Sequence, residues 1–324
     1  MNVPIETAFV LGAGLGTRLR SLTAHRPKPL LPICQKPLVT FAFDHLIRNG
    51  AKKIIINTHH CRESYPATFP DSRYRGVPLH FEHEPTLLET GGGIKNIEPL
   101  VRNHTFIVYN GDILTDLPLD RAVREHFERR NEVTLVLRSF GGPLHISLDE
   151  QSGRVIDIAG RLRGEEKTQK YLFACIYIVS PSFLFRIPSR TKISVIPIFL
   201  NMIQKGHALG GVVIDEGQWW DLGTRENYLD VHRFFSQPDF PFKVERGVTA
   251  GTWPQWIHPS ARIAQSARIS GATVIGAGAN VGERAQLTDC VLWEEAHVAP
   301  DSVLKSCIVT AGQVASGSHA NFDF

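Results

Sequence analysis

Several features that would assign a chain to a familiar class are missing from this sequence. Its 324 residues carry a formal net charge of only +3 and no block of lysines or arginines, so nucleic acid is not an expected partner. No apolar run approaches the ~18 residues that cross a bilayer, and the N-terminus lacks the basic segment of a secretion signal, so no membrane partner is expected. The five cysteines form no C-x-x-C pair, and none of the 14 histidines has the H-E-x-x-H spacing of a zinc site. We therefore expect reduced thiols and a cytoplasmic protein.

Length and composition indicate a globular protein of two domains. A chain of 324 residues exceeds one typical domain, and 43% hydrophobic with 21% charged residues is ordinary for globular proteins. In the first part, short apolar stretches alternate with polar stretches of helical spacing, which favours an α/β fold with a mostly parallel, Rossmann-like sheet. Ligands of such sheets bind at the carboxyl ends of the strands, here at Gly12, Asn110 and Ser180. The expected strands cover residues 8–11, 53–57, 79–82, 106–109, 133–138 and 171–179, and the expected helices cover residues 39–49 and 120–131.

The first expected strand runs directly into a glycine-rich turn, Leu11-Gly12-Ala13-Gly14-Leu15-Gly16-Thr17-Arg18-Leu19. Glycines allow positive φ and a close approach of the backbone, so that successive N–H groups can point at phosphate oxygens. A helix starting near Thr17 would add the positive end of its dipole. The dinucleotide fingerprint does not fit, because Thr17 stands where its third glycine belongs, and a P-loop would need a lysine after Gly16. The turn thus predicts a phosphate site of another kind.

The pattern G-x-G-x-G-T-R-L followed by Pro27-Lys28-Pro29-Leu30-Leu31-Pro32 resembles the signature of the sugar-1-phosphate nucleotidyltransferases, also called sugar-nucleotide pyrophosphorylases. The resemblance implies an enzyme that transfers a nucleotidyl group from a nucleoside triphosphate to a sugar 1-phosphate and releases pyrophosphate. It implies that the turn wraps the triphosphate, that Arg18 lies beside the leaving pyrophosphate, and that Lys28 bridges the nucleotide α-phosphate and the sugar phosphate. These two substrates are the expected partners.

Three further segments carry the same resemblance. Glu89-Thr90-Gly91-Gly92-Gly93-Ile94 is similar to the family segment that runs beneath the nucleobase. Tyr109-Asn110-Gly111-Asp112 and Trp219-Trp220-Asp221-Leu222-Gly223-Thr224 resemble the segments that carry the family's two magnesium-binding aspartates, and carboxylates suit that hard cation. The resemblance therefore implies Mg²⁺ as cofactor, held by Asp112 and Asp221. The implied catalytic residues are Arg18, Lys28 and Asp112, and the implied nucleotide-binding residues are Leu11, Gly12, Ala13, Gly14, Gly16, Thr17, Arg18, Glu89, Thr90, Gly91, Gly92 and Asn110.

The expected sugar pocket departs from the family pattern. Many relatives carry E-K-P ahead of a glycine-containing strand, whereas this chain has Glu165-Glu166-Lys167-Thr168. In addition, Cys175 stands where the family usually places glycine. Lys28, Lys167 and Lys170 are the candidates for binding the sugar phosphate.

A different pattern follows residues 236–255, whose prolines and glycines predict a linker. Beyond the linker an apolar residue recurs every six positions, usually with a small residue two positions before it, and the period shifts near residues 288–295. This resembles the hexapeptide repeat of the left-handed parallel β-helix, so we expect a catalytic domain over 1–235 and a β-helix over 256–324. A short β-helix needs cover for its open end, which favours a homo-oligomer. The six apolar positions are Ile257, Ile263, Ile269, Ile275, Val281 and Leu287.

The substrates and the class of protein have alternatives. The two-domain plan is similar to that of GDP-mannose pyrophosphorylases, which favours a mannose-1-phosphate guanylyltransferase. The segments around Gly92 and Asp221 also resemble N-acetylmuramate-1-phosphate uridylyltransferases and heptose-1-phosphate guanylyltransferases. A non-catalytic regulatory subunit would typically have lost Arg18 or a metal aspartate, and a hexapeptide acyltransferase would need a histidine on a coil, for which His297 is the candidate.

Overall fold

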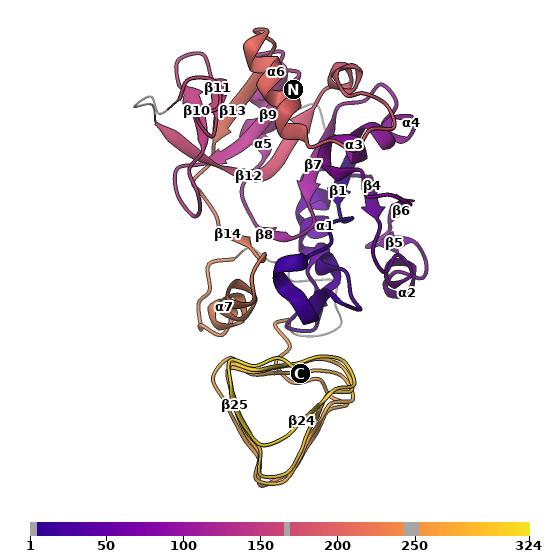
Figure 1. The fold of residues 1–324 in the computed structure, drawn as a ribbon, viewed down its shortest axis with the longest axis vertical. Helices are drawn as coiled ribbons and strands as arrows, with labels where there is room; N and C mark the ends of the chain where they lie inside the picture. Colours follow the sequence, from indigo (N-terminus) through magenta and orange to yellow (C-terminus); the bar gives the residue numbers. More distant parts are fainter. Residues whose placement is uncertain (1–4, 165–168, 243–252) are drawn as a thin grey trace. The chain divides into compact units, whose positions relative to one another are not determined.

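The structure of the chain is a computed structural model that describes residues 5–164, 169–242 and 253–324 (Figure 1). The chain divides into two compact units, and each is described by itself. The first, the sheet unit, comprises the chain up to residue 15 and residues 41–220. The second, the coil unit, comprises residues 16–40 and 221–324. In the described part of the chain, no helix is both long enough and apolar enough to span a bilayer.

The sheet unit is built on ten strands in the order β10-β11-β13-β9-β12-β7-β1-β4-β6-β5. These strands are β1 (Thr7–Leu11), β4 (Lys53–Thr58), β5 (Arg73–Tyr74), β6 (Val77–His83), β7 (Phe106–Asn110), β9 (Val133–Arg138), β10 (Ile146–Asp149), β11 (Arg154–Ile158), β12 (Lys170–Val179) and β13 (Leu209–Val213). The helical elements are α1 (Val39–Arg48), α2 (Ser64–Thr68), α3 (Glu89–Asn96), α4 (Glu98–Val101), α5 (Asp120–Glu128), the 3₁₀ helix η3 (Pro181–Arg186) and α6 (Val195–Gln204). A separate two-stranded sheet joins β8 (Ile113–Thr115) to β14 (Trp219–Asp221).

The sheet is parallel in one half and mixed in the other. Strands β7, β1, β4 and β6 run parallel, and their near-continuous apolar residues, such as Ile54, Ile55 and Ile56, are fully buried, as expected of a sheet covered on both faces. Strand β12 is antiparallel to β7 and to β9. A parallel pair of strands usually needs a helical crossover between them. The described residues between β9 and β12 contain no helix, in agreement with the antiparallel direction of β12. The expectation of a mostly parallel sheet therefore holds only for the first half.

The direction of β12 corrects one expected ligand position. Val179 pairs with Phe106, the first residue of β7, so Ser180 lies at the opposite edge of the sheet from Asn110. Its hydroxyl donates to the backbone oxygen of Asn131 and contacts the His126 ring. Ser180 is thus a structural residue, whereas Gly12 and Asn110 do share an edge.

Among the residues that the structure describes, the coil unit contains an irregular segment, the α-helix α7 (Arg225–Phe235) and three small parallel sheets. The irregular segment holds the 3₁₀ helices η1 (Thr17–Thr23) and η2 (Lys28–Leu30) and the paired short strands β2 (Pro32–Ile33) and β3 (Lys36–Pro37). The three sheets have the strand orders β15-β18-β21-β24, β16-β19-β22-β25 and β17-β20-β23. Their strands are β15 (Arg262–Ile263), β16 (Arg268–Ser270), β17 (Val274–Ile275), β18 (Asn280–Val281), β19 (Gln286–Thr288), β20 (Val291–Leu292), β21 (His297–Val298), β22 (Val303–Lys305), β23 (Ile308–Val309), β24 (Val314–Ala315) and β25 (Ser318–Ala320).

The short strands of the three sheets stack in successive coils with a triangular outline around a shared apolar interior (Figure 1). Ile263 pairs with Val281, eighteen positions later, and Val281 pairs with Val298, seventeen positions later. The shorter turn arises between Leu287 and Leu292, which are five positions apart, at the place where the sequence period shifts. Five of the six periodic residues lie in the coils' apolar cluster or against it, whereas Ile257 is exposed.

Three buried histidines make the stability of the fold depend on pH. Burial lowers the pKa of His45, His126 and His232 to about 4. A histidine with a lower pKa in the folded state than in the unfolded one stabilises the fold fully above about pH 6.5, and this contribution is lost as the pH falls towards 4. We expect the free energy of unfolding to drop by roughly 2 kcal/mol per buried histidine between pH 7 and 5. Denaturant titrations at both pH values test this, and equal denaturation midpoints would contradict it.

Candidate functional site

Side chains of the sheet unit form hydrogen bonds to the glycine-rich turn that follows β1. The Gly12 N–H donates to Asn57 Oδ1 at 2.7 Å, and the Tyr65 hydroxyl donates to the Gly12 oxygen at 3.0 Å. A Cβ at Gly12 would lie 2.7 Å from that hydroxyl, so the close packing of these groups requires glycine here. A Cβ at Gly14, by contrast, would meet nothing within 4 Å. In the described part of the chain, packing does not require glycine at position 14. The missing side chain instead leaves the backbone accessible to a ligand.

Strand β7 brings Asn110 and Asp112 to the same edge as this turn. Leu11 pairs with Asn110 in parallel register, and the Gly111 N–H donates to the Leu11 oxygen at 2.9 Å. Asn110 and Asp112 are both half-buried. Within the sheet unit, the turn residues Leu11, Gly12, Ala13 and Gly14 thus lie at the same end of the sheet as Asn110 and Asp112. That they form one binding site stays a prediction.

In the coil unit, Asp221 lies between two cations. Its carboxylate is 3.6 Å from Lys28 Nζ and 3.7 Å from an Arg18 guanidinium nitrogen. The Lys28 side chain is only 7% exposed, whereas those of Arg18 and Asp221 are 64% and 37% exposed. Two cations against one carboxylate leave a net positive charge, which attracts an anionic ligand.

Glycine at position 223 makes room for this cluster. A Cβ there would lie 2.5 Å from the nearer guanidinium nitrogen of Arg18. The Trp-x-Asp-Leu-Gly segment therefore contributes both the carboxylate of Asp221 and the space that Arg18 occupies. Lys28 itself is the first residue of η2, with a proline on either side that restricts its backbone.

The helix expected after the turn is short and of another type. Gly16 has φ +64°, and the chain continues from Thr17 as a seven-residue 3₁₀ helix, η1, rather than as an α-helix. The Thr23 hydroxyl donates to the Gly16 oxygen at 3.0 Å, which stabilises this tight conformation. Because a short 3₁₀ helix offers no long row of aligned peptide dipoles, the predicted dipole contribution to phosphate binding is not supported.

The glycines at 91 and 92 have a packing role that the sequence did not reveal. Both lie in the first turns of α3, and their N–H groups donate to the Ile193 oxygen at 2.8 and 3.0 Å. A Cβ at Gly92 would lie 2.4 Å from the Thr191 oxygen. These amides are therefore occupied by the chain itself. Exposed Glu89 and half-buried Thr90 precede them, and the contact with a nucleobase stays a prediction.

Of the lysines proposed for the sugar phosphate, Lys167 lies outside the described residues, and Lys170 is half-buried as the first residue of β12. Strand β12 also contains Cys175, which has φ +60° at an irregularity between Phe173 and Tyr177. This left-handed conformation explains why glycine suits the position, because glycine alone adopts it without steric cost.

We expect Cys175→Gly to raise the free energy of unfolding by about 1 kcal/mol, since it relieves the left-handed strain of a residue with a Cβ. Thermal unfolding of the variant measures the effect. Cys61→Gly is a second variant for comparison, because Cys61 also has a positive φ but lies outside the sheet. An unchanged or lower melting temperature for Cys175→Gly would contradict the strain argument.

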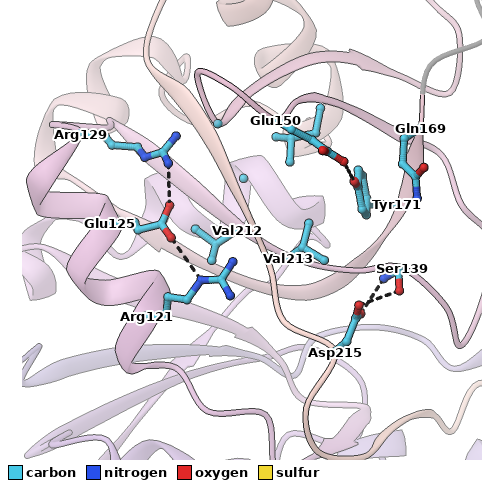
Figure 2. A pocket seen from close by; sticks show the side chains of 13 residues that line it. Arg121, Glu125, Arg129, Ser139, Glu150, Gln169, Tyr171, Val212, Val213 and Asp215 are labelled. Carbon is cyan, nitrogen blue, oxygen red and sulfur yellow. Dashed lines mark hydrogen bonds and ion pairs between the residues drawn. The ribbon is translucent and has the colours of Figure 1, made fainter.

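Two of the cavities in the described parts of the molecule lie near charged groups. One, of about 430 Å³ in the sheet unit, contains none of the predicted site residues (Figure 2). Its carboxylates are bound by groups of the same lining: Glu125 pairs with Arg121 and Arg129, Asp215 accepts from Ser139, and Glu150 accepts from the Tyr171 hydroxyl. The other, of about 630 Å³ in the coil unit, is lined by Thr17 and Arg18, the start of α7 and the last residues of the chain. Only the second adjoins the predicted phosphate site.

The assignment of Asp112 and Asp221 to a divalent cation stays a prediction. No group of three or more His, Cys, Asp or Glu side chains suited to a metal ion occurs among the residues that the structure describes. Mg²⁺ is commonly bound through one or two carboxylates together with water and substrate phosphates, so a full set of protein ligands is not required. Asp112 and Asp221 are both partly accessible carboxylates and suit that coordination.

Some residues that shape the site gave no motif signal. Asn57 and Tyr65 hold Gly12, and only the position of Asn57 at the carboxyl end of β4 could have drawn attention to it. Arg26 and Trp293 contact each other in the coil unit, far apart in sequence. The period shift near Thr288 was the sole hint at Trp293.

The fold and these residues define a class of α/β proteins, and comparison with known proteins identifies the family. Residues 7–237 match the Nucleotidyl transferase family, more than half of the chain, and the chain therefore belongs to this family of enzymes. Residues 252–318 match the family described as GMPPB C-terminal domain.

Individual relatives cover most of the chain. A mannose-1-phosphate guanylyltransferase of Mycobacterium tuberculosis is 29% identical over 302 residues, 92% of this chain and 82% of that protein. A UTP–glucose-1-phosphate uridylyltransferase of Synechocystis is 26% identical over 93% of this chain and 86% of that protein. The solved inositol-1-phosphate CTP transferase of T. maritima superimposes with a TM-score of 0.59 at 17% identity, over 70% of this chain and 93% of that one. This last likeness shows that the nucleotidyltransferase fold is shared.

Proposed function

We propose that the protein transfers a nucleotidyl group from GTP to mannose 1-phosphate, giving GDP-mannose and pyrophosphate. The observation that carries the proposal is buried Lys28 beside Asp221 and Arg18 in one compact cluster. Membership of the Nucleotidyl transferase family and the match of the C-terminal residues to the GMPPB C-terminal domain support it. The mycobacterial relative is a mannose-1-phosphate guanylyltransferase, which favours GTP and mannose 1-phosphate as substrates. The cyanobacterial relative is a UTP–glucose-1-phosphate uridylyltransferase, which makes UTP and glucose 1-phosphate the alternative pair.

The mechanism needs no protein nucleophile. The phosphate of a sugar 1-phosphate is ionised at neutral pH, so its oxygen can attack the α-phosphorus of the triphosphate directly. In our proposal Lys28 binds both phosphates and reduces their repulsion, and Arg18 stabilises the charge that develops on the pyrophosphate. Asp112 and Asp221 would hold Mg²⁺, which when bound neutralises phosphate charge. The turn from Leu11 to Thr17 would bind the triphosphate through its backbone.

The architecture and the remaining contacts complete the proposal. We propose that residues 1–235 form the catalytic domain and residues 236–255 a linker. In this proposal the coils of residues 256–324 are a left-handed parallel β-helix of hexapeptide repeats. The proposed nucleobase contacts are Glu89, Thr90, Gly91 and Gly92, and the proposed sugar-phosphate contacts are Lys28, Lys167 and Lys170. Self-association and a cytoplasmic location stay predictions.

A substrate matrix tests this function. GTP and UTP are each combined with mannose 1-phosphate, glucose 1-phosphate, a heptose 1-phosphate and N-acetylmuramate 1-phosphate in the presence of Mg²⁺, and pyrophosphate release is measured. We expect the highest kcat/KM for GTP with mannose 1-phosphate. A higher value for another pair would replace the substrates but keep the reaction class. No release from any pair would favour the regulatory subunit, and acetyl transfer from acetyl-CoA that requires His297 would favour the acyltransferase.

A further inference from the structure

The segment that carries Lys28 is held by side chains of the coils. Arg26, two positions before Lys28, forms an ion pair with Glu294. The Arg26 guanidinium also lies 4.8 Å from the centre of the Trp293 ring, within the range of a cation–π interaction. The N-terminal side of the Lys28 segment is thus anchored to two adjacent residues that follow β20.

The other side of the segment is anchored through the same tryptophan. The Trp293 indole N–H donates to the Tyr228 hydroxyl at 3.1 Å, and that hydroxyl donates to the Pro32 oxygen at 2.7 Å. Tyr228 is fully buried on α7. Trp293 therefore contacts Arg26 directly and Pro32 through one residue, so it reaches the chain on both sides of Lys28.

Trp293 is buried without being part of the coils' own interior. Its side chain is 4% exposed, yet the apolar cluster of the coils contains neighbouring Leu292 and Ala296 and does not include Trp293. A coil corner that served the coils alone would not need a large aromatic residue here. The residue also lies in the interval where the six-residue period shifts. Its burial is therefore explained by what packs on it from outside the coils.

We propose that Trp293 and Glu294 are positioning residues for Lys28, so that the coils contribute to nucleotidyl transfer without touching the substrates. The inference rests on the proposed function, in which Lys28 must lie between two phosphates. Small displacements of such a group cost much of the rate, because the advantage of a positioned charge depends on its geometry. A second contact, in which Arg225 binds Asp323 at 2.7 Å, anchors the start of α7 near Asp221 to the end of the chain.

Two conservative variants test the proposal. Glu294→Gln removes the charge of a half-exposed side chain, and Trp293→Phe removes the indole N–H while keeping an aromatic ring. We expect each to lower kcat by about tenfold with little change in the KM for GTP, since the group is needed most in the transition state. Asp301→Asn is the matched control, because Asp301 pairs with Arg284 on an exposed part of the coils. If Trp293→Phe fails to fold, Glu294→Gln carries the test alone.

A double-mutant cycle separates positioning from a merely structural role. If Glu294 acts through Lys28, then Glu294→Gln should cause no further loss of activity in a Lys28→Met background. An equal loss in both backgrounds, or kcat within twofold of the unmodified protein in the single variants, would overturn the proposal.

Hydrogen exchange makes the inference testable even if the substrates are wrong. The backbone amides of Lys28, Leu30, Leu31, Ile33 and Cys34 should exchange faster in Glu294→Gln than in the unmodified protein and in Asp301→Asn. Unchanged exchange would overturn the positioning role. If the unmodified protein released no pyrophosphate with any substrate pair, the proposed function would be overturned. The exchange rates would then still show whether Glu294 anchors the Lys28 segment.

Discussion

Replacement of Lys28 by methionine is expected to lower kcat/KM by about 10²–10³-fold, the effect of removing one positioned donor of charge from a transition state. Methionine keeps most of the apolar stem and volume of a side chain that is 7% exposed, so the change is mainly the loss of the ammonium group. Asp221 keeps Arg18 as a partner and is itself partly exposed, so its carboxylate remains solvated. Steady-state kinetics with GTP and mannose 1-phosphate measure the effect.

The matched control is Lys52→Met, the same chemical change at an exposed position where Lys52 pairs with Glu6. This variant should retain activity within about twofold, because surface ion pairs contribute little. Thermal unfolding of both variants shows whether either has lost its fold. A Lys28→Met protein that is folded and retains more than a tenth of the activity would contradict the role of Lys28.

The second large effect is expected for Asp112→Asn, which should lower kcat by about 10³-fold. Asparagine is almost isosteric with aspartate but lacks the negative charge that binds a divalent cation, and such a cation is worth several kcal/mol in phosphate chemistry. Asp221→Asn should act in the same direction. Activity is measured against Mg²⁺ concentration, and both variants should need more Mg²⁺ for half-maximal rate.

An exposed aspartate in a turn of the sheet unit supplies the control, Asp71→Asn, which should leave both the rate and the Mg²⁺ requirement unchanged. Chelation of divalent cations by EDTA should abolish activity of the unmodified protein, and added Mg²⁺ should restore it. If Asp112→Asn showed the same Mg²⁺ dependence and rate as the unmodified protein, the assignment of Asp112 would be wrong.

The positions of several strands could be predicted, because an apolar run bounded by polar residues is typical of a buried strand. Strands β1, β4, β7 and β9 begin and end within a residue or two of the expected positions, because continuous apolar runs bounded by polar residues have few other solutions. Leu11 and Asn110 could be placed at one edge for the same reason. Helix α5 ends three residues earlier than expected, at Glu128.

The direction of strands and the packing of glycines could not be predicted in this way. Apolar periodicity does not distinguish a parallel strand from an antiparallel one, so Ser180 was placed at the wrong edge. The packing role of the glycines at 91 and 92 could not be predicted either, because the oxygens of Thr191 and Ile193 beside them lie a hundred residues later in the chain. Close approach of two backbones gives the same sequence signal as close approach of a ligand.

Membership of a compact unit was also outside the reach of the sequence. Residues 16–40 follow a strand of the sheet unit, yet they belong with the coils, because Arg26 contacts Trp293 and Gln35 donates to the Ile275 oxygen at 2.8 Å. Such contacts join residues more than two hundred positions apart and leave no local pattern.

In the proposed reaction, the α-phosphorus of the triphosphate is transferred to a sugar 1-phosphate. The most direct measurement follows two labels: GTP labelled with ³²P at the α-phosphate or at the γ-phosphate is incubated with mannose 1-phosphate and Mg²⁺, and the products are separated. The α-label should appear in GDP-mannose and the γ-label in pyrophosphate. Appearance of the γ-label in a sugar phosphate, or of the α-label only in free GDP or GMP, would contradict the account.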